Sequence, residues 1–593
     1  MATPIDVAGL SAQLVGLAFQ AFQGCLDAYS FIYDAQNIGN DGDFARVRLQ
    51  IEHERLQRWG TRCGLSGTQP SETLNWSLIF QILSQQRDIM TSAEVLKKRY
   101  NLILPVDVFH EEVSENGSAT SEVKERSGLN RFLQALRPEL YQRRSAKVIA
   151  SKNGVVKRIR WAAAGRDQLD KIIRELGVLN VELERQLTDA DLKWLHSGMS
   201  ALLRELISRS TNVGEVSQIQ QLLYPSLSSE CDALSAAAMF KRVRLYVGAD
   251  KRNDETRPAT TRSIRNTMPA LVELSAKRLS PNTKTSYKGY VVGTYSGEAV
   301  LVEWRLLSSS PDDDVLRCVR SFAMLLSSAD QSFASLRCKG LVIVDNDDLH
   351  RYGLVYQLPA LDEDNKNDAF QKESLYDIMR GGCKVALSQR FRIALKMCEA
   401  VLQLHTAGWL HKNIRSENVL FFKSATSSGN EPEVRDPYMI GYDNVRPDSL
   451  EAAAKLTLSS DTSLYHDLYR HPAKRSHMIT TYEKTHDLYA LACLLTEIAL
   501  WQPLVQIFTC HGGRNWTVDI EIAERDNKDL ALPSMFDLSH SLAFQQEIQH
   551  AVGPRYMETI GLCLDGSKGM SREQTISMDL HQSIVEKLRS CEV

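Results

Sequence analysis

The first part of the chain has apolar residues at the three- and four-residue spacing of amphipathic helices. This spacing recurs in four segments, Val7–Leu26, Phe44–Trp59, Leu74–Tyr100 and Arg166–Leu187. The strict alternation that marks a half-buried strand does not occur between them. Residues 1–215 are therefore predicted to form an all-helical bundle.

The first of these predicted helices is uncharged. No Asp, Glu, Lys or Arg occurs from Val7 to Leu26, a length of about twenty residues that can cross a bilayer as a helix. Several glutamines and glycines make the run less apolar than an ordinary transmembrane helix. Two interpretations stay open: a core helix of the bundle, or a helix that leaves the bundle and enters a membrane. In the second case the candidate lipid-facing residues are Val7, Leu10, Leu14, Val15 and Leu17.

A basic stretch lies in the same region. The segment from Arg126 to Arg160 contains ten Lys or Arg and one acidic residue, Glu139. Such a run is usually a solvated face or loop, but beside an uncharged helix it can also draw a domain to anionic lipid. Anionic membrane lipid is therefore a candidate partner.

The pattern changes in the second half of the chain. Residues 216–283 are predicted to be a linker, because Lys251–Asn266 is polar and charged with one large apolar residue, Ile264. From residue 284 to 590 both strand and helix patterns occur. Tyr287–Leu307 alternates as a β-hairpin does, and Leu387–Thr406 has the apolar period of a long helix. This mixture predicts an α+β domain.

Composition narrows the class of protein. A chain of 593 residues is too long for one core, and its 43% hydrophobic and 24% charged residues are typical of globular domains. The net charge of −3 argues against a nucleic-acid partner. Eleven cysteines lack the spacing of zinc ligands, so no metal site is assigned. The first basic residue is Arg46, which does not fit a signal peptide, and a cytoplasmic location is expected.

The helical region resembles a known family. The segments DVAGLSAQLVGLAFQAFQGCLDAYSFI, RVRLQIEHERLQRWG and KRIRWAAAGRDQLDKIIRELGVLNVELERQL occur in the order seen in the HeLo domain of fungal HET-S-type proteins. The resemblance implies an all-helical bundle whose N-terminal helix is released to insert into membranes in programmed cell death and heterokaryon incompatibility.

The second region resembles the protein kinases. Its segments WLHKNIRSENVLFF and DLYALACLLTEIALW are similar to the kinase catalytic loop, H-R-D-L-x-x-x-N, and to the long helix behind that loop. The resemblance implies a bilobal α+β fold and gives roles to a set of loop positions and to one structural aspartate. These residues are His411, Asn413, Arg415 and Asn418 in the loop, and Asp487 on the helix.

The chemistry that a kinase requires is altered at several of these positions. Asn413 stands where kinases have the catalytic Asp, and an amide cannot take the proton of the attacking hydroxyl. The segment YMIGYD stands in place of D-F-G, with Gly441 at the Asp position unless a shift of two residues brings in Asp443.

The nucleotide-binding pattern is also altered. Gly289, Gly293 and Gly297 are four residues apart and do not match G-x-G-x-x-G. The strand Val300–Leu306 has no Lys, and alignment can place Glu303, Trp304 or Arg305 at the Lys position. Gly289, Gly293 and Arg305 remain as nucleotide-binding candidates. ATP and Mg²⁺ would bind only if the site is competent.

These observations predict a multidomain chain: a HeLo bundle at 1–215, a linker at 216–283 and a kinase-like domain, interpreted as a pseudokinase, at 284–590. The layout resembles an animal necroptosis effector of the mixed-lineage kinase-like type, which is an analogy of fold. The predicted function is membrane-directed cell-death signalling in a fungus, with a protein partner or a second copy and relocation to the plasma membrane on activation. An active atypical Ser/Thr kinase and a non-enzymatic scaffold stay as alternatives.

Overall fold

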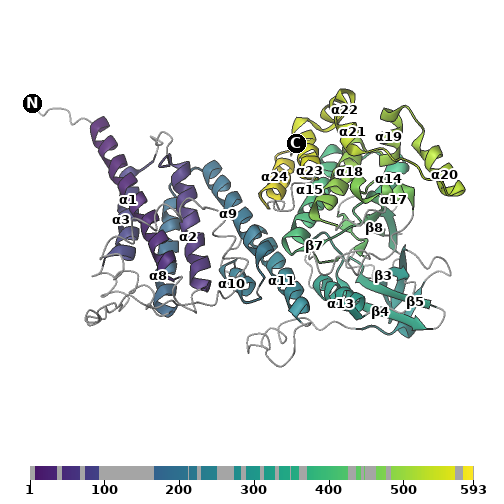
Figure 1. The fold of residues 1–593 in the computed structure, drawn as a ribbon, viewed down its shortest axis with the longest axis horizontal. Coiled ribbons are helices and arrows are strands. Elements are labelled where there is room, and N and C mark those ends of the chain that lie inside the picture. The colour runs from purple at the N-terminus through teal and green to yellow at the C-terminus, as the bar shows by residue number, and fades with distance from the viewer. Residues whose placement is uncertain are drawn as a thin grey trace, which may run out of the picture. The chain divides into compact units, whose positions relative to one another are not determined.

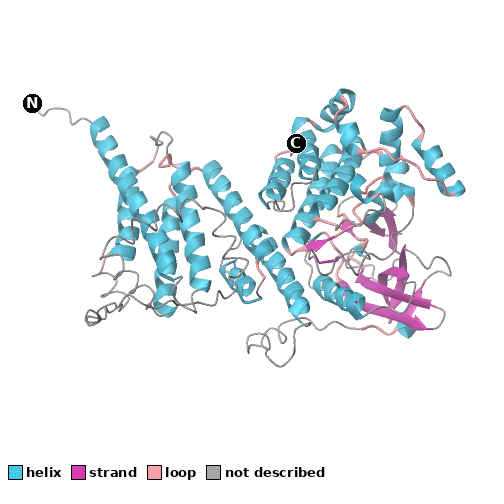
Figure 2. Ribbon diagram, in the orientation of Figure 1, coloured by secondary structure: helices cyan, strands magenta, loops and turns pink. Residues whose placement is uncertain are grey.

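The computed structural model describes residues 7–36, 43–66, 74–92, 166–211, 213–223, 229–249, 273–281, 289–306, 313–327, 333–346, 349–359, 370–424, 436–442, 446–447, 463–475, 482–567 and 578–591. The chain divides into two compact units, Met1–Leu222 and Leu223–Val593. Every described element of the first unit is a helix, and the strands lie in the second (Figures 1 and 2).

The first unit is a helical bundle. Its elements are α1 (Val7–Gln36), α2 (Asp43–Arg62), α3 (Trp76–Thr91), α8 (Arg166–Glu184), α9 (Asp189–Arg209) and α10 (Val213–Leu223). Helix α1 packs along α3, and α2 packs along α8. The core between them is apolar and contains Phe22, Tyr29, Trp59 and Leu176. Burial of these large side chains is the main force that holds the four helices together.

Two ion pairs, formed by residues seven positions apart on α2, fix this helix to α8. Arg55 binds Glu184 of α8 in a bidentate manner, with Nε to Oε1 at 2.9 Å and Nη2 to Oε2 at 2.8 Å. Arg48 pairs with Asp170 of α8 at 2.9 Å. Because these pairs are partly buried and specific in geometry, they set the register of α2 against α8.

The second unit begins with a helix and an antiparallel sheet. Helix α11 (Ser229–Ala249) precedes β1 (Leu279–Pro281), β2 (Gly289–Tyr295), β3 (Glu298–Leu306), α13 (Asp313–Ser327), β4 (Cys338–Asn346) and β5 (Leu349–Gln357). The sheet has the strand order β1-β2-β3-β5-β4, and all of its pairs are antiparallel. The predicted hairpin corresponds to β2 and β3, whose turn is formed by Ser296 and Gly297 at positive φ.

The rest of the second unit is mainly helical. Its elements are β6 (Phe370–Ser374), α14 (Leu375–Arg380), α15 (Leu387–Thr406), β7 (Trp409–Leu410), β8 (Val419–Ser424), β9 (Tyr438–Met439), β10 (Arg446–Pro447), α17 (Leu464–Asp467), α18 (Lys484–Leu500), α19 (Leu504–Gly512), α20 (Trp516–Asp526), α21 (Met535–Ser539), α22 (Leu542–Val552), α23 (Pro554–Ser567) and α24 (Met578–Arg589). Helix α18 is buried nearly all round: its central part is apolar, and its buried residues also include Asp487 and Glu497.

The observed architecture is a helical bundle followed by a mixed α/β region with antiparallel sheets. The kinase-like assignment of the second region stays a prediction. The described elements inside the predicted linker 216–283 include α11, which belongs to the second unit and packs on α13 and α15, and β1, which pairs with β2 in the sheet. The basic stretch from Arg126 to Arg160 lies outside the described residues.

Candidate functional site

The loop after β7 is held from behind by a buried carboxylate. Asp487 of α18 accepts hydrogen bonds from the backbone N–H groups of His411, at 2.8 Å, and Lys412, at 2.9 Å. His405 of α15 donates its Nε2–H to the same carboxylate at 3.0 Å. These bonds hold Lys412 at a φ of +66°, a backbone conformation that residues other than glycine rarely adopt. The shape of the loop therefore depends on Asp487.

Two titratable groups behind the loop have displaced pKa values. Burial would raise the pKa of Asp487, but the hydrogen bond from His405 and the nearby imidazoles outweigh burial and hold this pKa below its usual value. Burial lowers the pKa of His411 to about 4. Asp487 is therefore ionised and His411 is neutral near pH 7, which makes this a fixed anchor and not a proton-transfer pair.

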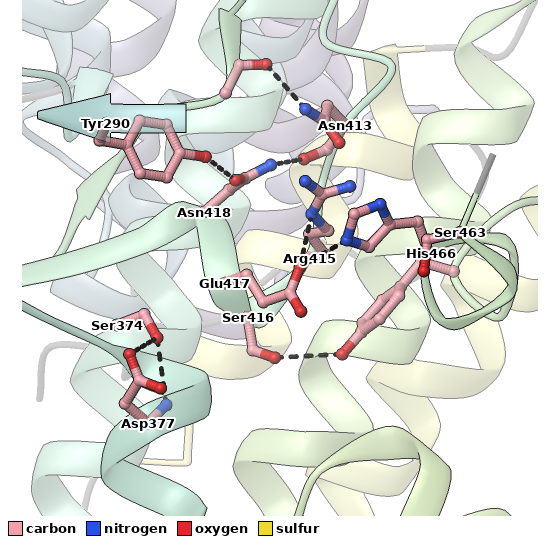
Figure 3. Close-up of polar contacts among 12 residues, drawn as sticks. Tyr290, Ser374, Asp377, Asn413, Arg415, Ser416, Glu417, Asn418, Ser463 and His466 are labelled. Atoms are coloured by element: carbon pink, nitrogen blue, oxygen red, sulfur yellow. Dashed lines mark hydrogen bonds and ion pairs between the residues drawn. The ribbon is translucent and has the colours of Figure 1, made fainter. Parts of the chain in front are cut away.

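A cluster of amide groups lies in front of the loop (Figure 3). Asn418 Nδ2 donates to the backbone oxygen of Asn413 at 2.6 Å, and Asn413 Nδ2 donates to the backbone oxygen of Gly441 at 3.4 Å. The hydroxyl of Tyr290, on β2, donates to Asn418 Oδ1. We call Tyr290, Asn413, Asn418 and Gly441 the amide cluster. Its polar groups bind one another across 128 residues of sequence.

The amide cluster leaves no room for a side chain at Gly441. This glycine has a φ of +86°, and a Cβ placed on it would overlap the Asn418 amide and lie 3.2 Å from Asn413 Nδ2. Both the backbone conformation and the space therefore require glycine. An aspartate cannot occupy the position while the two asparagines stay in place.

Tyr290 is also held on its other side. Lys372 of β6 donates from Nζ to the backbone oxygen of Tyr290 at 2.8 Å, and its ammonium lies 5.4 Å from the centre of the Tyr290 ring. Burial lowers the pKa of Lys372. The start of β2 is thus fastened both to the loop and to β6.

The chemistry available to the amide cluster is limited. Amides accept and donate hydrogen bonds, but they do not act as proton acceptors near pH 7. Mg²⁺ sites normally include carboxylate ligands, and the four members of the cluster have none. Within the described ranges, no three His, Cys, Asp or Glu side chains are grouped as metal ligands would be. Asp443 lies outside those ranges.

Strand β3 places a carboxylate, not a cation, in the interior. Trp304 lies with Val300 and Val302 in the outer cluster of the sheet. Glu303 points to the opposite side, is 4% exposed and accepts a hydrogen bond from the Tyr356 hydroxyl at 2.9 Å. Burial and the neighbouring Glu303 raise the pKa of Tyr356 well above its usual value. Arg305 is only partly buried.

The glycine candidates lie within the hairpin. Gly293 pairs with Val300 inside β2, and Gly289 begins that strand at a φ of +94°. No side chain would meet an obstacle at Gly289. Gly293 is thus an interior residue of β2, and Gly289 has a backbone conformation that favours glycine; nucleotide binding at these positions stays a prediction.

Below the loop, Arg415 contacts a second polar group (Figure 3). Arg415 Nε lies 2.9 Å from Glu417 Oε2, and His466 Nε2 lies 3.0 Å from the same oxygen. Beside them, Glu497 of α18 accepts hydrogen bonds from Ser416 Oγ, Tyr469 OH and the backbone N–H of Leu504. Burial raises the pKa of Glu497 to about 8. These contacts fix the end of the loop on α18.

In the first unit, α1 is anchored by its central part. Its side chains from Ala18 to Ile32 include Phe22, Cys25 and Tyr29, all inside the core. Leu14 and Val15 are half-buried, and Leu17 is 43% exposed. The side chains of Val7 and Leu10 lie outside the described set. Within the described part of the chain no single helix has the length and hydropathy of a membrane span; α18 and α19 reach them only together, bent by 78°.

A buried polar network ties α1 to three other helices. Gln86 Nε2 of α3 donates to the Tyr29 hydroxyl at 3.0 Å and to Asn180 Oδ1 of α8 at 2.9 Å. Asn180 Nδ2 donates to Glu52 Oε2 of α2 at 2.8 Å. Removing α1 from the bundle would leave this network without the Tyr29 oxygen.

Sequence reasoning missed several of these contacts. Tyr290 carries no local signal, because its partner Asn418 is 128 residues away. The packing of Phe22 on Gly60 and the approach of Arg244 to Gly408 also join residues that are far apart in sequence. Glu303, Trp304 and Arg305 were the three candidates for the position of the kinase lysine on β3. Only the direction in which the side chains point from the strand distinguishes Glu303.

Comparison with known proteins identifies the first unit. Residues 9–222 match the HeLo family, described as prion-inhibition and propagation. The N-terminal part of the chain is therefore a HeLo domain. A curated relative, heterokaryon incompatibility protein s of Podospora anserina, is 23% identical over 194 residues, which cover 31% of this chain and 60% of the relative. The relationship is distant, and the chain matches less than two thirds of the relative's length.

Proposed function

We propose that this protein is a fungal cell-death effector in which the HeLo domain acts on membranes and the second unit, a kinase-like domain without catalytic activity, regulates it. The observation that carries the regulatory part is the amide cluster, which ties the positions of the former kinase chemistry to one another and to β2. The HeLo match and the name of the Podospora relative support the cell-death part.

Three contacts in the second unit argue against phosphate transfer. Where a kinase has its catalytic base, this chain has Asn413, whose side-chain amide binds the backbone oxygen of Gly441. The position of the metal-binding aspartate is Gly441, where a side chain does not fit. The strand that should supply a Lys presents the buried carboxylate of Glu303. A carboxylate repels phosphate groups where a kinase needs a cation to hold them.

The uncharged sequence of α1 and its packing in the core support an action on membranes. The helix is uncharged from Val7 to Leu26, and its apolar face is the face that packs in the core. The same face cannot be in the core and in lipid at one time. Each large side chain that leaves the core forfeits roughly 1.5–3 kcal/mol, which lipid contact would return. The helix thus has two alternative environments of similar polarity, and a second domain can decide between them.

In this proposal the protein resides in the cytoplasm and relocates to anionic membrane on activation. A protein partner or a second copy of the chain is the trigger. The basic stretch 126–160 would supply attraction of about 1 kcal/mol per basic residue near the surface. Added salt should weaken that attraction.

Vesicle leakage tests the proposal. Residues 1–222 and the full chain are compared at equal concentration on vesicles of phosphatidylcholine with and without phosphatidylserine. We expect the fragment to release dye from the anionic vesicles and the full chain to release much less. A fragment that is folded by circular dichroism and yet releases nothing would favour the scaffold alternative. Equal release by the two proteins would remove the regulatory role of the second unit.

A further inference from the structure

Helix α11 is an integral part of the second unit, although it lies in a segment with the sequence position of a linker. Phe240 is completely buried in the main core of this unit, and its ring centre is 3.8 Å from that of Phe333. The helix packs on α13 and on α15. Helix α10 ends at Leu223 and α11 begins at Ser229, so α11 is the first described element of the second unit after the HeLo match.

One contact of α11 reaches the loop that carries the amide cluster. The guanidinium of Arg244 lies against Gly408, directly before β7, so closely that a Cβ on Gly408 would overlap it. Gly408 has a φ of +75°. The residue after it, Trp409, starts the segment that leads to His411 and Asn413.

A second contact reaches the same region through aromatic packing. Phe322 of α13, the helix on which α11 packs, contacts Trp409 at 5.2 Å and Tyr442 at 5.0 Å between ring centres. The backbone N–H of Met439 donates to the oxygen of Ala334, the neighbour of Phe333. Two of the three segments that form the amide cluster, the loop after β7 and the segment after β9, are therefore packed against α13 or against the neighbour of Phe333, and α11 packs on both α13 and Phe333.

We infer that α11 is the coupling helix of this protein: its docking on α13 and Gly408 depends on the arrangement of the amide cluster, and its release frees the HeLo domain. The inference rests on the proposed function for its second half only. Closely packed side chains have few alternative arrangements, so a displacement of the loop at Gly408 must be taken up by Arg244 and the helix that carries it.

Substitution of Gly408 tests the coupling in the full chain. Gly408→Ala adds a methyl group that overlaps Arg244, whereas Gly513→Ala, in the left-handed region at a φ of +60° with open space around it, adds only the backbone strain of a left-handed alanine. We expect amide hydrogen exchange in residues 234–243 to be about tenfold faster, or more, in Gly408→Ala than in Gly513→Ala. The double variant Arg244→Ala/Gly408→Ala, which removes the overlap, should restore slow exchange.

A second variant tests the coupling from α11 toward the loop and does not involve Gly408. Phe240→Leu removes the ring contact with Phe333 with little loss of volume, and reciprocity of coupling requires faster exchange in α13 and residues 409–411. If Gly408→Ala and Gly513→Ala exchange alike in α11, and Phe240→Leu leaves α13 and the loop unchanged, the coupling is refuted.

Leakage separates this inference from the proposed function. A variant with a loosened α11 should bring leakage by the full chain toward that of residues 1–222. If the fragment leaks and the loosened full chain stays silent, α11 does not control release and the inference fails while the proposed function stands. If the fragment itself does not leak, the proposed function fails, and the exchange measurements alone decide whether α11 and the loop are coupled.

Discussion

The ring of Phe22 on α1 occupies the space that a side chain at Gly60 on α2 would need. A Cβ built on Gly60 overlaps the ring edge of Phe22, and Phe22 is fully buried. Glycine at this point lets the two helices approach closely, and the aromatic ring fills the depression that the missing side chain leaves. The pair is thus one of the contacts that hold α1 in the bundle.

We expect Gly60→Ala to weaken the hold on α1. The added methyl group forces Phe22 to move, and overpacking of this kind costs about 1–3 kcal/mol, more than the gain in helix propensity from alanine. Cys25, a buried thiol of α1, reports the change, because its labelling followed by peptide mass spectrometry should become faster. Gly16→Ala is the matched control, since nothing lies within 4 Å of a Cβ there. Equal labelling rates in the two variants would contradict the prediction.

The second unit should not transfer phosphate, and restoring single kinase residues should not rescue it. Asn413→Asp supplies a base, but Gly441→Asp places a side chain against Asn418 and in a left-handed conformation, so we expect it to destabilise the second unit without conferring activity. Incorporation of radiolabelled phosphate with Mg²⁺ or Mn²⁺ is the measurement. Incorporation by the wild-type chain that survives repurification and is lost in Asn418→Ala would show that the site is active.

Tyr290→Phe should loosen the start of β2. The substitution removes the hydroxyl that binds Asn418 and keeps the ring, so we expect a loss of about 1 kcal/mol from one hydrogen bond. Hydrogen exchange in β2 and in residues 413–418 should become faster. Tyr295→Phe is the control on the same strand, where the ring packs in the outer cluster of the sheet. A Tyr290→Phe variant that matches Tyr295→Phe at both segments would rule out a fastening role for the Tyr290 hydroxyl.

The stability of the second unit should depend on pH through Glu497. Burial raises the pKa of this carboxyl from 4.5 to about 8. The stability that it contributes is therefore fully present below about pH 4.5 and is lost as the pH rises to about 8, because over this range the carboxyl is ionised in the unfolded chain and neutral in the folded one. Glu497→Gln keeps an oxygen that can accept from Ser416, Tyr469 and Leu504 but does not ionise. We expect the variant to gain on the wild type by up to about 1.4 kcal/mol per pH unit between about pH 5 and pH 8.

Urea unfolding of the second unit at several pH values measures this difference. The free energy of unfolding of the variant, minus that of the wild type, should rise steadily with pH. A difference that does not change with pH would mean that Glu497 is ionised in the folded state, and the proposed burial of a neutral carboxyl would be wrong.

Features that depend on neighbouring residues along the chain could be predicted from the amino-acid sequence. The helical period from Val7 to Leu187 was enough to predict the bundle, because side chains three and four residues apart share a helix face whatever the fold around them. The HeLo resemblance was confirmed over residues 9–222. The hairpin of β2 and β3 also followed from local alternation and a glycine at its turn.

Contacts between residues that are distant in sequence could not be predicted in this way. Nothing near Tyr290 in sequence points to Asn418, nothing near Arg244 points to Gly408, and nothing near Phe22 points to Gly60. The facing of β3 made Glu303 the interior residue and put Trp304 outside, a choice that a shift of one residue would reverse. Such contacts are set by the packing of whole elements against each other, and a local pattern carries no information about it.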